Sequence, residues 1–335
     1  MYGKSERFLY VPSLQKGLSN QKLQMLRVVR LTKLLDRTLI IPGLNDFLYS
    51  SNVTVEEARI CQDKILCHTI PFSGVFDVSK FKQDLHHHLN VSSVDISEIP
   101  RNWKQLWSIG EIMIPKRLKF EKVKETALFQ RLGAVAQMRV IILNGLVSSL
   151  PHLESKVSQK GYTAQEYDAT VMNAFHVNDF LRDRLSSLYP KSFFTGCSHQ
   201  VNFTLALHVR AEPDMYRLCK NACFTGKQML SWAADYFHVY QNTSIMLVLT
   251  GPTLKFDTIN YLAGLGWCAS KVSGLVKKED LLHIQQAAID YEVGKRASIF
   301  VGLRLSSFSS EMFKVRRDLN KLSWEFVKGA VVPWS

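Results

Sequence analysis

A run of apolar and β-branched residues in the second half of the chain, residues 203–207, constrains the fold more than any other stretch. An almost continuous apolar run of this length is typical of a strand buried on both faces, as in a parallel sheet. His208 and Arg210 follow the run, and Glu212 and Asp214 come next. Open α/β sheets bind ligands at the carboxyl ends of their strands, so this spacing predicts a ligand site. Arg210 has a permanent charge and a planar fork of donors that fits phosphate or carboxylate.

The length and charge of the chain indicate its number of domains and the kind of ligand that it binds. Its 335 residues exceed the usual size of one hydrophobic core, so we expect two domains, residues 1–190 and 191–335, with a linker near 191–200. Lys and Arg number 42 against 29 Asp and Glu, a formal net charge of +13 that favours an anionic ligand. No basic motif interleaved with aromatic residues occurs, so nucleic acid is not an expected partner.

The sequence contains opposing indications of its cellular compartment. No apolar run reaches the roughly 18 residues that a membrane span needs, and the N-terminus lacks the apolar core of a signal peptide. Four glycosylation sequons, which begin at Asn52, Asn90, Asn202 and Asn242, favour a secretory lumen. We therefore expect a lumenal catalytic region, in the Golgi or endoplasmic reticulum, whose membrane anchor is absent from this chain.

Cysteine and histidine spacing predicts no metal site. The six cysteines permit up to three disulfides of unknown pairing, with reduced buried thiols as the alternative, and the close pairs lack the Cys-x-x-Cys spacing of zinc sites. His86, His87 and His88 are adjacent, and neighbouring helical positions point in different directions. Three histidines in this arrangement are typical of a polar helix surface.

Short apolar segments alternate with amphipathic ones, which predicts an α/β fold. In the first half we expect strands at 7–11, 38–41 and 93–96, and helices at 19–36, 116–149 and 164–188. In the second half we expect strands at 203–207, 244–250 and 298–301, and helices at 227–240, 256–262, 278–292 and 310–328. Ser19 or Asn20 is the expected N-cap of the first helix. The loop before that helix belongs to a βαβ unit and is a natural place for phosphate or sugar groups.

Several familiar nucleotide and hydrolase motifs are missing. The chain has neither a P-loop nor a Gly-x-Gly-x-x-Gly turn after a strand. It also has no Gly-x-Ser-x-Gly elbow and no His-Glu-x-x-His helix. These absences disfavour P-loop ATPases, dehydrogenases, hydrolases of these types and zinc proteases.

Three positive features remain, and each also has an ordinary structural interpretation. The loop 15–21 contains Gly17, which lets a ligand approach the backbone, but it could equally be a simple helix start. Residues 208–214 could bind a phosphate or form a salt-bridged strand end. Residues 300–310 place a glycine and several serines between a strand and a helix, which suits a diphosphate. The alternative for this last segment is a capping motif with Ser309 or Ser310 as N-cap.

Together, the three features resemble, in order and spacing, the motifs of the GDP-fucose-dependent fucosyltransferases. The chain looks most like the plant-type O-fucosyltransferase-like group, which includes a pectin rhamnosyltransferase branch. The matching segments are Gly17 to Gln21, Leu207 to Met215, and Asp290 to Ala297 with Phe300, Gly302, Ser306, Ser307, Phe308 and Arg316. The resemblance extends over nearly the whole chain.

This resemblance implies a fold of GT-B type, with two Rossmann-like domains facing across a cleft. It also implies an inverting, metal-independent transfer of fucose from GDP-fucose, without a cofactor, to a hydroxyl of a protein or glycan. Arg210 would hold the β-phosphate and stabilise the leaving diphosphate, which agrees with the general need to meet developing negative charge. His208 would contact the nucleotide, and Ser306, Ser307 and Phe308 would bind the phosphates and fucose.

The resemblance leaves part of the acceptor chemistry unassigned. Gly17 and Asn20 would lie on the acceptor side, but this chain has Lys16-Gly17 where the family usually has a pair of glycines. The acidic residue that some branches use as base has no match in this loop. Glu212 and Asp214 are expected to orient Arg210. A rhamnosyl or other sugar transferase, and an inactive nucleotide-sugar-binding protein, are the alternatives.

Overall fold

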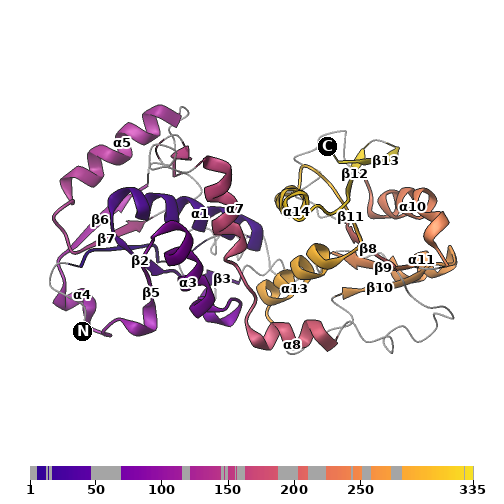
Figure 1. The fold of residues 1–335 in the computed structure, drawn as a ribbon, viewed down its shortest axis with the longest axis horizontal. Helices are drawn as coiled ribbons and strands as arrows, with labels where there is room; N and C mark the ends of the chain where they lie inside the picture. The colour runs from indigo at the N-terminus through magenta and orange to yellow at the C-terminus, as the bar shows by residue number, and fades with distance from the viewer. Residues whose placement is uncertain are drawn as a thin grey trace, which may run out of the picture. The chain divides into compact units, whose positions relative to one another are not determined.

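The structure is a computed structural model, and it describes two compact units that together contain most of the chain. The described residues are 6–12, 14, 17–46, 69–114, 121–144, 147, 150–154, 156, 163–187, 203–209, 224–242, 244–250, 258–272, 281–327 and 329–334. Within these residues, those up to Asn178 form the first unit and those from Asp179 onward form the second. Each unit is described by itself below (Figure 1).

The first unit is built on a parallel sheet with the strand order β5-β2-β1-β7-β6. Its strands are β1 (Phe8–Tyr10), β2 (Thr38–Ile41), β5 (Ser93–Asp95), β6 (Ile109–Met113) and β7 (Val140–Asn144). Its helices are α1 (Leu18–Leu35), α3 (Val78–Leu89), α4 (Trp103–Leu106), α5 (Glu121–Ala134) and α7 (Ala164–Asn173), with short 3-10 turns η1 (Phe72–Gly74) and η2 (Ile96–Glu98). A small antiparallel pair, β3 (Leu44–Asn45) and β4 (Thr69–Ile70), lies outside the sheet.

Residues at the ends of the helices in this unit explain where the helices begin and stop. The Asp77 side chain accepts a hydrogen bond from Lys80 N–H at the start of α3 (3.0 Å). Thr163 and Glu166 form a reciprocal capping box at the start of α7. Both α1 and α3 end on residues in the left-handed conformation, Asp36 and Asn90. These boundaries follow from the local sequence.

One face of the first sheet packs against a cluster of aromatic residues. Phe8 of β1 stacks on Trp107 with ring centroids 4.8 Å apart, and Trp103 of α4 meets Tyr10 edge-on at 5.7 Å. The Arg139 guanidinium lies 4.4 Å over the Trp107 ring, a cation–π contact. This cluster joins the crossover segment between β5 and β6 to the strands that it passes.

The second unit contains a larger sheet with the strand order β10-β9-β8-β11-β12-β13. Its strands are β8 (Phe203–His208), β9 (Ser244–Leu249), β10 (Cys268–Lys271), β11 (Ile299–Gly302), β12 (Ser323–Val327) and β13 (Ala330–Pro333). All pairs are parallel except β12 with β13. Its helices are α8 (Asp179–Ser187), α10 (Gly226–Tyr236), α11 (Thr258–Gly264), α13 (His283–Arg296) and α14 (Ser307–Asp318), with the 3-10 turn η6 (His238–Tyr240).

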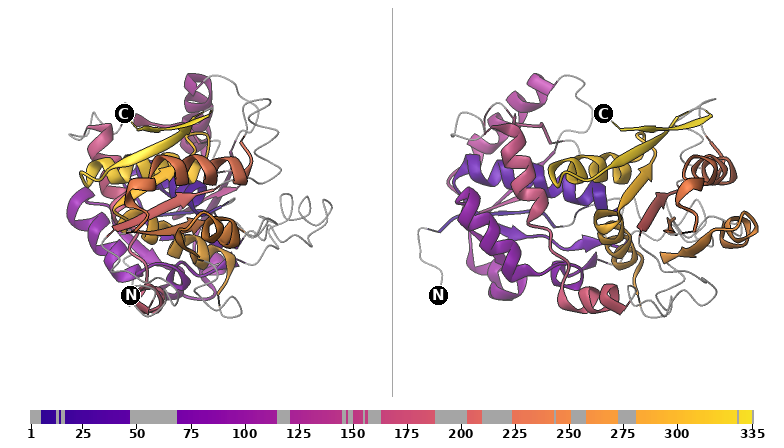
Figure 2. Two further views of the ribbon diagram at one scale, coloured as in Figure 1. Left: turned by 90° about the vertical axis from the view of Figure 1, so that its right-hand side faces the viewer. Right: turned by 45° about the vertical axis from the view of Figure 1, so that its right-hand side comes forward.

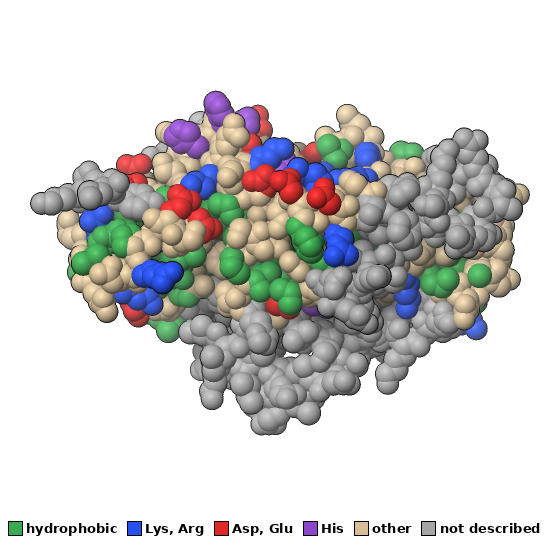
Figure 3. Space-filling view, turned by 90° about the horizontal axis from the view of Figure 1, so that it is seen from below, with side chains coloured by type: hydrophobic (Ala, Val, Ile, Leu, Met, Phe, Trp, Pro, Cys, Tyr) green, Lys and Arg blue, Asp and Glu red, His purple; other side chains and the backbone are tan. Residues whose placement is uncertain are grey.

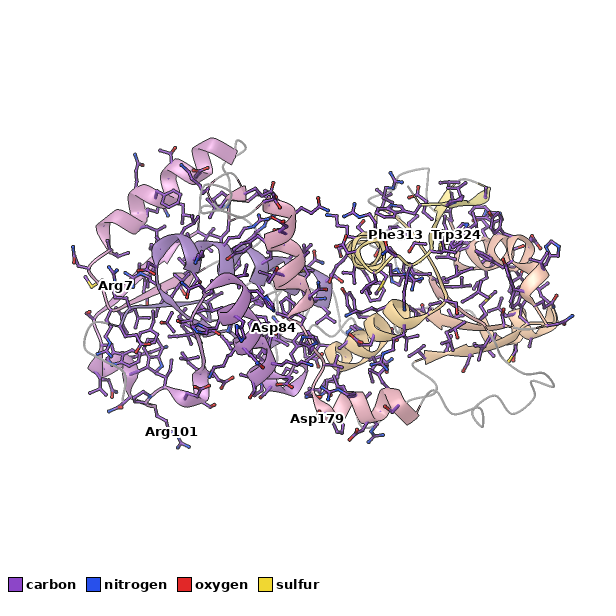
Figure 4. All side chains as sticks on the ribbon, viewed as in Figure 1. Arg7, Asp84, Arg101, Asp179, Phe313 and Trp324 are labelled. Atoms are coloured by element: carbon purple, nitrogen blue, oxygen red, sulfur yellow. The ribbon has the colours of Figure 1, made fainter. Side chains whose placement is uncertain are left out.

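Helices cover both faces of the second sheet. Figure 1 shows α13 and α14 on one side and α10 and α11 on the other, and Figure 2 shows the same layers from two further directions. Aromatic side chains line both layers, as Figure 4 shows for Phe313 and Trp324. Phe313 of α14 packs on Phe300 of β11 with ring centroids 5.5 Å apart, and Trp324 of β12 packs on Phe237 at 5.6 Å. Burial on both faces explains why the central strands β8, β9 and β11 are mostly apolar.

The structure corrects the helix predicted at residues 116–149. Helix α5 ends at Ala134, β6 precedes it, and residues 140–144 form the strand β7. The run Val140 to Leu143 also fits helical spacing, but all four residues are buried between β1 and β6. Short apolar runs cannot be assigned from periodicity alone, and here pairing with two neighbouring strands decides the outcome.

Two other predicted helices are interrupted. The helix predicted at 164–188 divides into α7 and α8, because the backbone between them forms a bridge from Val177 to Phe76 and a hydrogen bond from Asp77 N–H to the His176 carbonyl. The helix predicted at 310–328 stops at Asp318, Asn320 has a φ of 54°, and the chain then forms β12 beside β11. The predicted linker 191–200 lies outside the described residues, and the boundary at 190/191 stays a prediction.

Candidate functional site

The carboxyl end of β8 places His208 on the face of the second sheet that α13 and α14 cover. The strand lies between β9 and β11, and its alternate residues Leu205, Leu207 and Val209 enter the core on the opposite face. The Val209 N–H donates to the Leu249 carbonyl at 3.0 Å. The chain therefore stays hydrogen-bonded to β9 as far as Val209, the last residue described before position 224. Arg210, Glu212 and Asp214 lie outside the described residues, so their roles stay predictions.

The segment after β11 is the serine-rich connection that the sequence indicated. Strand β11 ends at Gly302, and α14 begins at Ser307 with Ser306 as its N-cap. Ser306 is fully buried, its N–H donates to the Leu303 carbonyl (2.9 Å), and its carbonyl accepts from the Ser310 N–H (2.9 Å). Neither Ser309 nor Ser310 is the N-cap, because the helix begins one turn earlier than that alternative requires.

His208 is held by two neighbours from the beginning of α14. Its Nδ1 lies 2.7 Å from the Ser309 Oγ, and its ring centroid lies 4.4 Å from that of Phe308, with the planes tilted by 31°. His208 and Ser309 are buried, while Ser307 and Phe308 are partly exposed. The structure thus brings together four residues that the sequence proposed for one donor site: His208, Ser306, Ser307 and Phe308.

Helix α13 contributes the other side of this cluster. Tyr291 meets Phe308 edge-on, with ring centroids 5.9 Å apart. Burial raises the pKa of the Tyr291 phenol well above its usual value, and the Glu311 carboxylate beside it adds to the rise. Tyr291 is therefore neutral at physiological pH, and its ring packs edge-on against Phe308.

Asp290, the residue before Tyr291, has an unusual ionisation equilibrium. Burial raises the pKa of its carboxyl to about 7, although a hydrogen bond from Gln286 Nε2 to Asp290 Oδ1 (3.0 Å) lowers it. Titratable groups with strongly shifted pKa values gather at functional sites, but structural ones also occur. Near neutral pH this carboxyl changes between its neutral and charged forms.

Arg316, one of the residues of the matching C-terminal segment, has a structural role in this fold. The side chain is fully buried. Its guanidinium donates to five carbonyl oxygens, those of Gly294, Lys295, Ala297, Ser298 and Leu322, and to the Ser323 hydroxyl. These contacts join the carboxyl end of α13 to the loop between α14 and β12.

The predicted acceptor-side residues lie in the first unit, at the start of α1. Gly17 is the N-cap, not Ser19 or Asn20, and its φ of −65° is accessible to any residue. Among the described atoms, nothing lies within 4 Å of the Cβ that a larger residue would carry there. The local fold does not require glycine at this position. Asn20 is partly exposed in the first turn.

The neighbouring residue Gln21 anchors this part of α1. Its side chain is buried, donates to the Asn45 carbonyl at 2.7 Å and accepts from the Asn45 N–H at 2.9 Å. These two hydrogen bonds tie the beginning of α1 to β3. The start of the helix, with Gly17 and Asn20, is thus held in place from within the first unit.

Other titratable clusters do not form a second site in the described part of the chain. No group of three or more His, Cys, Asp or Glu residues there could hold a metal ion. His86, His87 and His88 are exposed, and Figure 3 shows histidine side chains gathered at one edge of a surface that otherwise mixes both charges. Asp84 of α3, labelled in Figure 4, pairs with His176 at 2.9 Å.

Three findings concern the cysteines, the membrane spans and the sequons. Cys268 in β10 is the only cysteine within the described ranges, and it is disulfide-bonded. In the same part of the chain, no helix combines the length and the apolar character that crossing a bilayer requires. Asn90 and Asn242, which begin two of the four sequons, are exposed.

Comparison with known proteins identifies similar chains. No family model matches. O-fucosyltransferase 23 of Arabidopsis thaliana is 25% identical over 341 residues, which span 92% of this chain and 70% of that protein. This similarity confirms the predicted resemblance to the O-fucosyltransferase-like superfamily and supports the glycosyltransferase class.

Crystal structures of two fucosyltransferases have a similar fold. POFUT1 in its apo form has a TM-score of 0.62 at 13% identity, with 97% of this chain and 99% of that chain covered. NodZ alpha-1,6-fucosyltransferase soaked with GDP-fucose has a TM-score of 0.51 at 12% identity, with 99% of each chain covered. Together with the parallel strand pairs that dominate both sheets, these neighbours confirm the predicted α/β fold class with two Rossmann-like domains.

Sequence reasoning missed two residues of the cluster, Ser309 and Tyr291. The sequence pattern predicts Ser309 only as a helix cap, and Tyr291 only as part of a longer matching segment. A possible signal was the spacing of Ser309, two residues after Ser307 in the segment that also holds Phe308. Without the fold, nothing in the sequence connects Ser309 to His208.

Proposed function

We propose that this chain, similar to the O-fucosyltransferase-like superfamily, is a glycosyltransferase that moves fucose from GDP-fucose to a hydroxyl of a protein or glycan. One observation carries the proposal: His208, Ser306, Ser307 and Phe308 gather at the carboxyl end of β8 and the beginning of α14. Support also comes from POFUT1, which has a similar fold and whose structures include a complex with GDP-fucose, at a TM-score of 0.56.

The donor would bind to the second unit. The first-turn N–H groups of a helix attract anions, so the beginning of α14 with Ser306 and Ser307 suits the diphosphate. His208 would donate to the nucleotide, and the partly exposed Phe308 ring would pack against the sugar. Arg210 follows His208 by two residues and would hold the β-phosphate with its fork of donors.

The transfer would proceed by direct displacement. The acceptor oxygen attacks C1 of fucose from the face opposite the diphosphate, the bond from C1 to the phosphate oxygen breaks, and the configuration at C1 inverts. GDP leaves with the bonding electrons, and the acceptor hydroxyl loses its proton. Arg210 and the N-terminus of α14 would stabilise the charge that develops on the leaving group, so no metal ion is required in this proposal.

The acceptor would approach residues of the first unit. Among the described atoms, Gly17 has open space beside its backbone, and Asn20 would lie on the acceptor side. Glu212 and Asp214 would orient Arg210. The acceptor proton would then leave through a group not yet assigned or through water.

The chain would act in the lumen of the secretory pathway, in the Golgi or endoplasmic reticulum. The disulfide at Cys268 supports this compartment, because structural disulfides persist in oxidising environments. The exposed side chains of Asn90 and Asn242 suit the attachment of glycans.

Binding measurements would separate the alternatives. Thermal unfolding is followed with GDP, UDP, GDP-fucose and UDP-rhamnose, because a ligand of the native state raises stability by mass action. We expect GDP and GDP-fucose to stabilise the protein selectively. Stabilisation by UDP compounds would favour another sugar transferase, and GDP-fucose binding without transfer or hydrolysis would indicate an inactive binding protein.

The variant Arg210→Ala tests the assigned chemistry. Loss of one electrostatic donor to the leaving group typically costs about 2–4 kcal/mol of transition-state stabilisation, so we expect kcat to fall by about 30- to 1,000-fold. Arg210→Lys is the matched control, since it keeps the charge and loses the planar fork; it should retain intermediate activity. Single-turnover transfer from labelled GDP-fucose is the measurement, and unchanged turnover in Arg210→Ala would refute the role.

A further inference from the structure

The hydroxyl of Ser309 joins the ends of two neighbouring strands. Ser309 is fully buried in the first turn of α14. Its Oγ lies 2.7 Å from the Nδ1 of His208 at the end of β8, and 3.2 Å from the Leu303 N–H just after β11. A hydroxyl has one proton to donate and two lone pairs that accept, so the identity of its partners limits its orientation.

Proton accounting selects one tautomer of His208. A backbone N–H can only donate, so Ser309 Oγ accepts from Leu303. The second lone pair could accept from a protonated Nδ1, but the proton of this buried hydroxyl would then have no acceptor, because the described residues give Ser309 Oγ no third hydrogen-bond partner. The hydroxyl proton is therefore donated to His208 Nδ1, at an O···N separation of 2.7 Å. A neutral imidazole that accepts at Nδ1 carries its proton on Nε2.

The glycine that ends β11 makes this contact possible. A Cβ at Gly302 would lie 2.4 Å from the Ser309 Oγ and 2.8 Å from the Ser309 Cβ. Any larger residue at position 302 would therefore displace the hydroxyl. Phe308, which lies on the face of the His208 ring, further restricts the orientation of the imidazole.

We propose that Ser309 is a positioning residue that holds His208 as the neutral Nε2–H tautomer. His208 then presents an N–H donor, and not a lone pair, to the phosphate or ribose oxygens of the nucleotide sugar. The ligand in this statement rests on the proposed function. The tautomer itself follows from contacts within the second unit and can be tested without any ligand.

The experiment combines spectroscopy with binding. Histidine ring ¹⁵N signals of the labelled protein distinguish protonated from unprotonated nitrogens, and loss of one set in His208→Gln identifies His208. We expect an unprotonated Nδ1 and a protonated Nε2 in the wild type. In Ser309→Ala we expect the two tautomers to mix and GDP affinity to fall by about 3- to 10-fold, the range for one neutral hydrogen bond.

Two further variants serve as controls. Ser309→Thr keeps the hydroxyl and should restore both the tautomer and the affinity. Ser310→Ala removes the neighbouring hydroxyl, which donates to the Arg304 carbonyl at 2.5 Å, and should change neither. A role in packing alone predicts that Ser309→Ala lowers the melting temperature and leaves the tautomer unchanged.

The results distinguish a failure of the tautomer assignment from a failure of the proposed function. A protonated Nδ1 in the wild type, or an unchanged tautomer in a folded Ser309→Ala, would overturn the inference even if GDP-fucose is the donor. A tautomer that depends on Ser309 in a protein that binds no GDP would leave the inference standing and refute the donor. The wild-type spectrum remains decisive if Ser309→Ala does not fold.

Discussion

At the scale of single residues, the second unit contains polar groups in surroundings that alter their chemistry. Asp290 is partly buried, and burial raises the pKa of its carboxyl to about 7 from the ordinary 3.8. A carboxyl whose pKa is raised on folding stabilises the folded state relatively more at low pH. The penalty of its charge therefore appears as pH rises from about 4 to about 7.

Asp290→Asn should accordingly stabilise the protein in a pH-dependent way. The full pKa shift corresponds to about 4 kcal/mol, at roughly 1.4 kcal/mol per pKa unit. Because the side chain is partly exposed, the expected gain in the free energy of unfolding is about 2 kcal/mol. We expect that gain at pH 8 and little change at pH 4.5, measured by urea unfolding without ligand. An equal change in stability at pH 8 and pH 4.5 would show that ionisation of this carboxyl does not destabilise the folded protein.

At the scale of elements, two cations, the buried Arg316 and the partly exposed Lys321, bind the carbonyl groups at the end of α13. Arg316 of α14 donates to carbonyl oxygens at the end of α13. The Lys321 Nζ donates to the carbonyls of Lys295 (3.0 Å) and Arg296 (3.2 Å). Carbonyl groups at a helix C-terminus have no intrahelical partner and carry partial negative charge. Burial lowers the pKa of Arg316 to about 10, which still leaves it charged at neutral pH.

Arg316→Met should therefore be strongly destabilising. Its loss would leave several buried carbonyls without donors, and we expect a cost of at least about 3 kcal/mol in the free energy of unfolding. Arg317→Met is the matched control, since the adjacent side chain is half exposed and should change stability by no more than about 0.5 kcal/mol. Denaturant unfolding of both variants is the check, and equal costs would contradict the structural role.

At the scale of the whole molecule, the proposed donor contacts and acceptor contacts lie in different units. His208, Ser306, Ser307 and Phe308 belong to the second, whereas Gly17 and Asn20 belong to the first. Each unit has its own parallel sheet and its own core. A nucleotide held mainly by contacts from β8 and α14 should stabilise the second unit more than the first.

Amide hydrogen exchange would show this division. With GDP we expect slower exchange at the end of β8 and from β11 into α14, because a ligand suppresses local opening where it binds. The strands β2 and β7 of the first unit should change little. UDP is the control ligand, and protection confined to the first unit would contradict the assignment of the donor site.

Much of the fold and part of the site could be predicted from the sequence. The strands β1, β2, β8, β9 and β11 were predicted within two residues, because each is an apolar run with turn residues at its ends. His208 and the segment 306–308 were also selected from sequence, since a ligand site at the end of a buried strand needs polar residues there. The helix predicted across β7 was wrong, because the continuous apolar run Val140 to Leu143 fits the periodicity of a helix as well as that of a strand.

The sequence by itself determined the local pattern: which segments are apolar enough to be buried, and which motifs resemble the fucosyltransferases. Only the tertiary structure decided which polar atoms meet. Ser309 and His208 are 101 positions apart, and Arg316 reaches carbonyls up to 22 positions away. A hydrogen bond depends on distance and direction between two atoms, and the packing of β8, β11, α13 and α14 sets both. Packing therefore made Arg316 structural and gave Ser309 its proposed role.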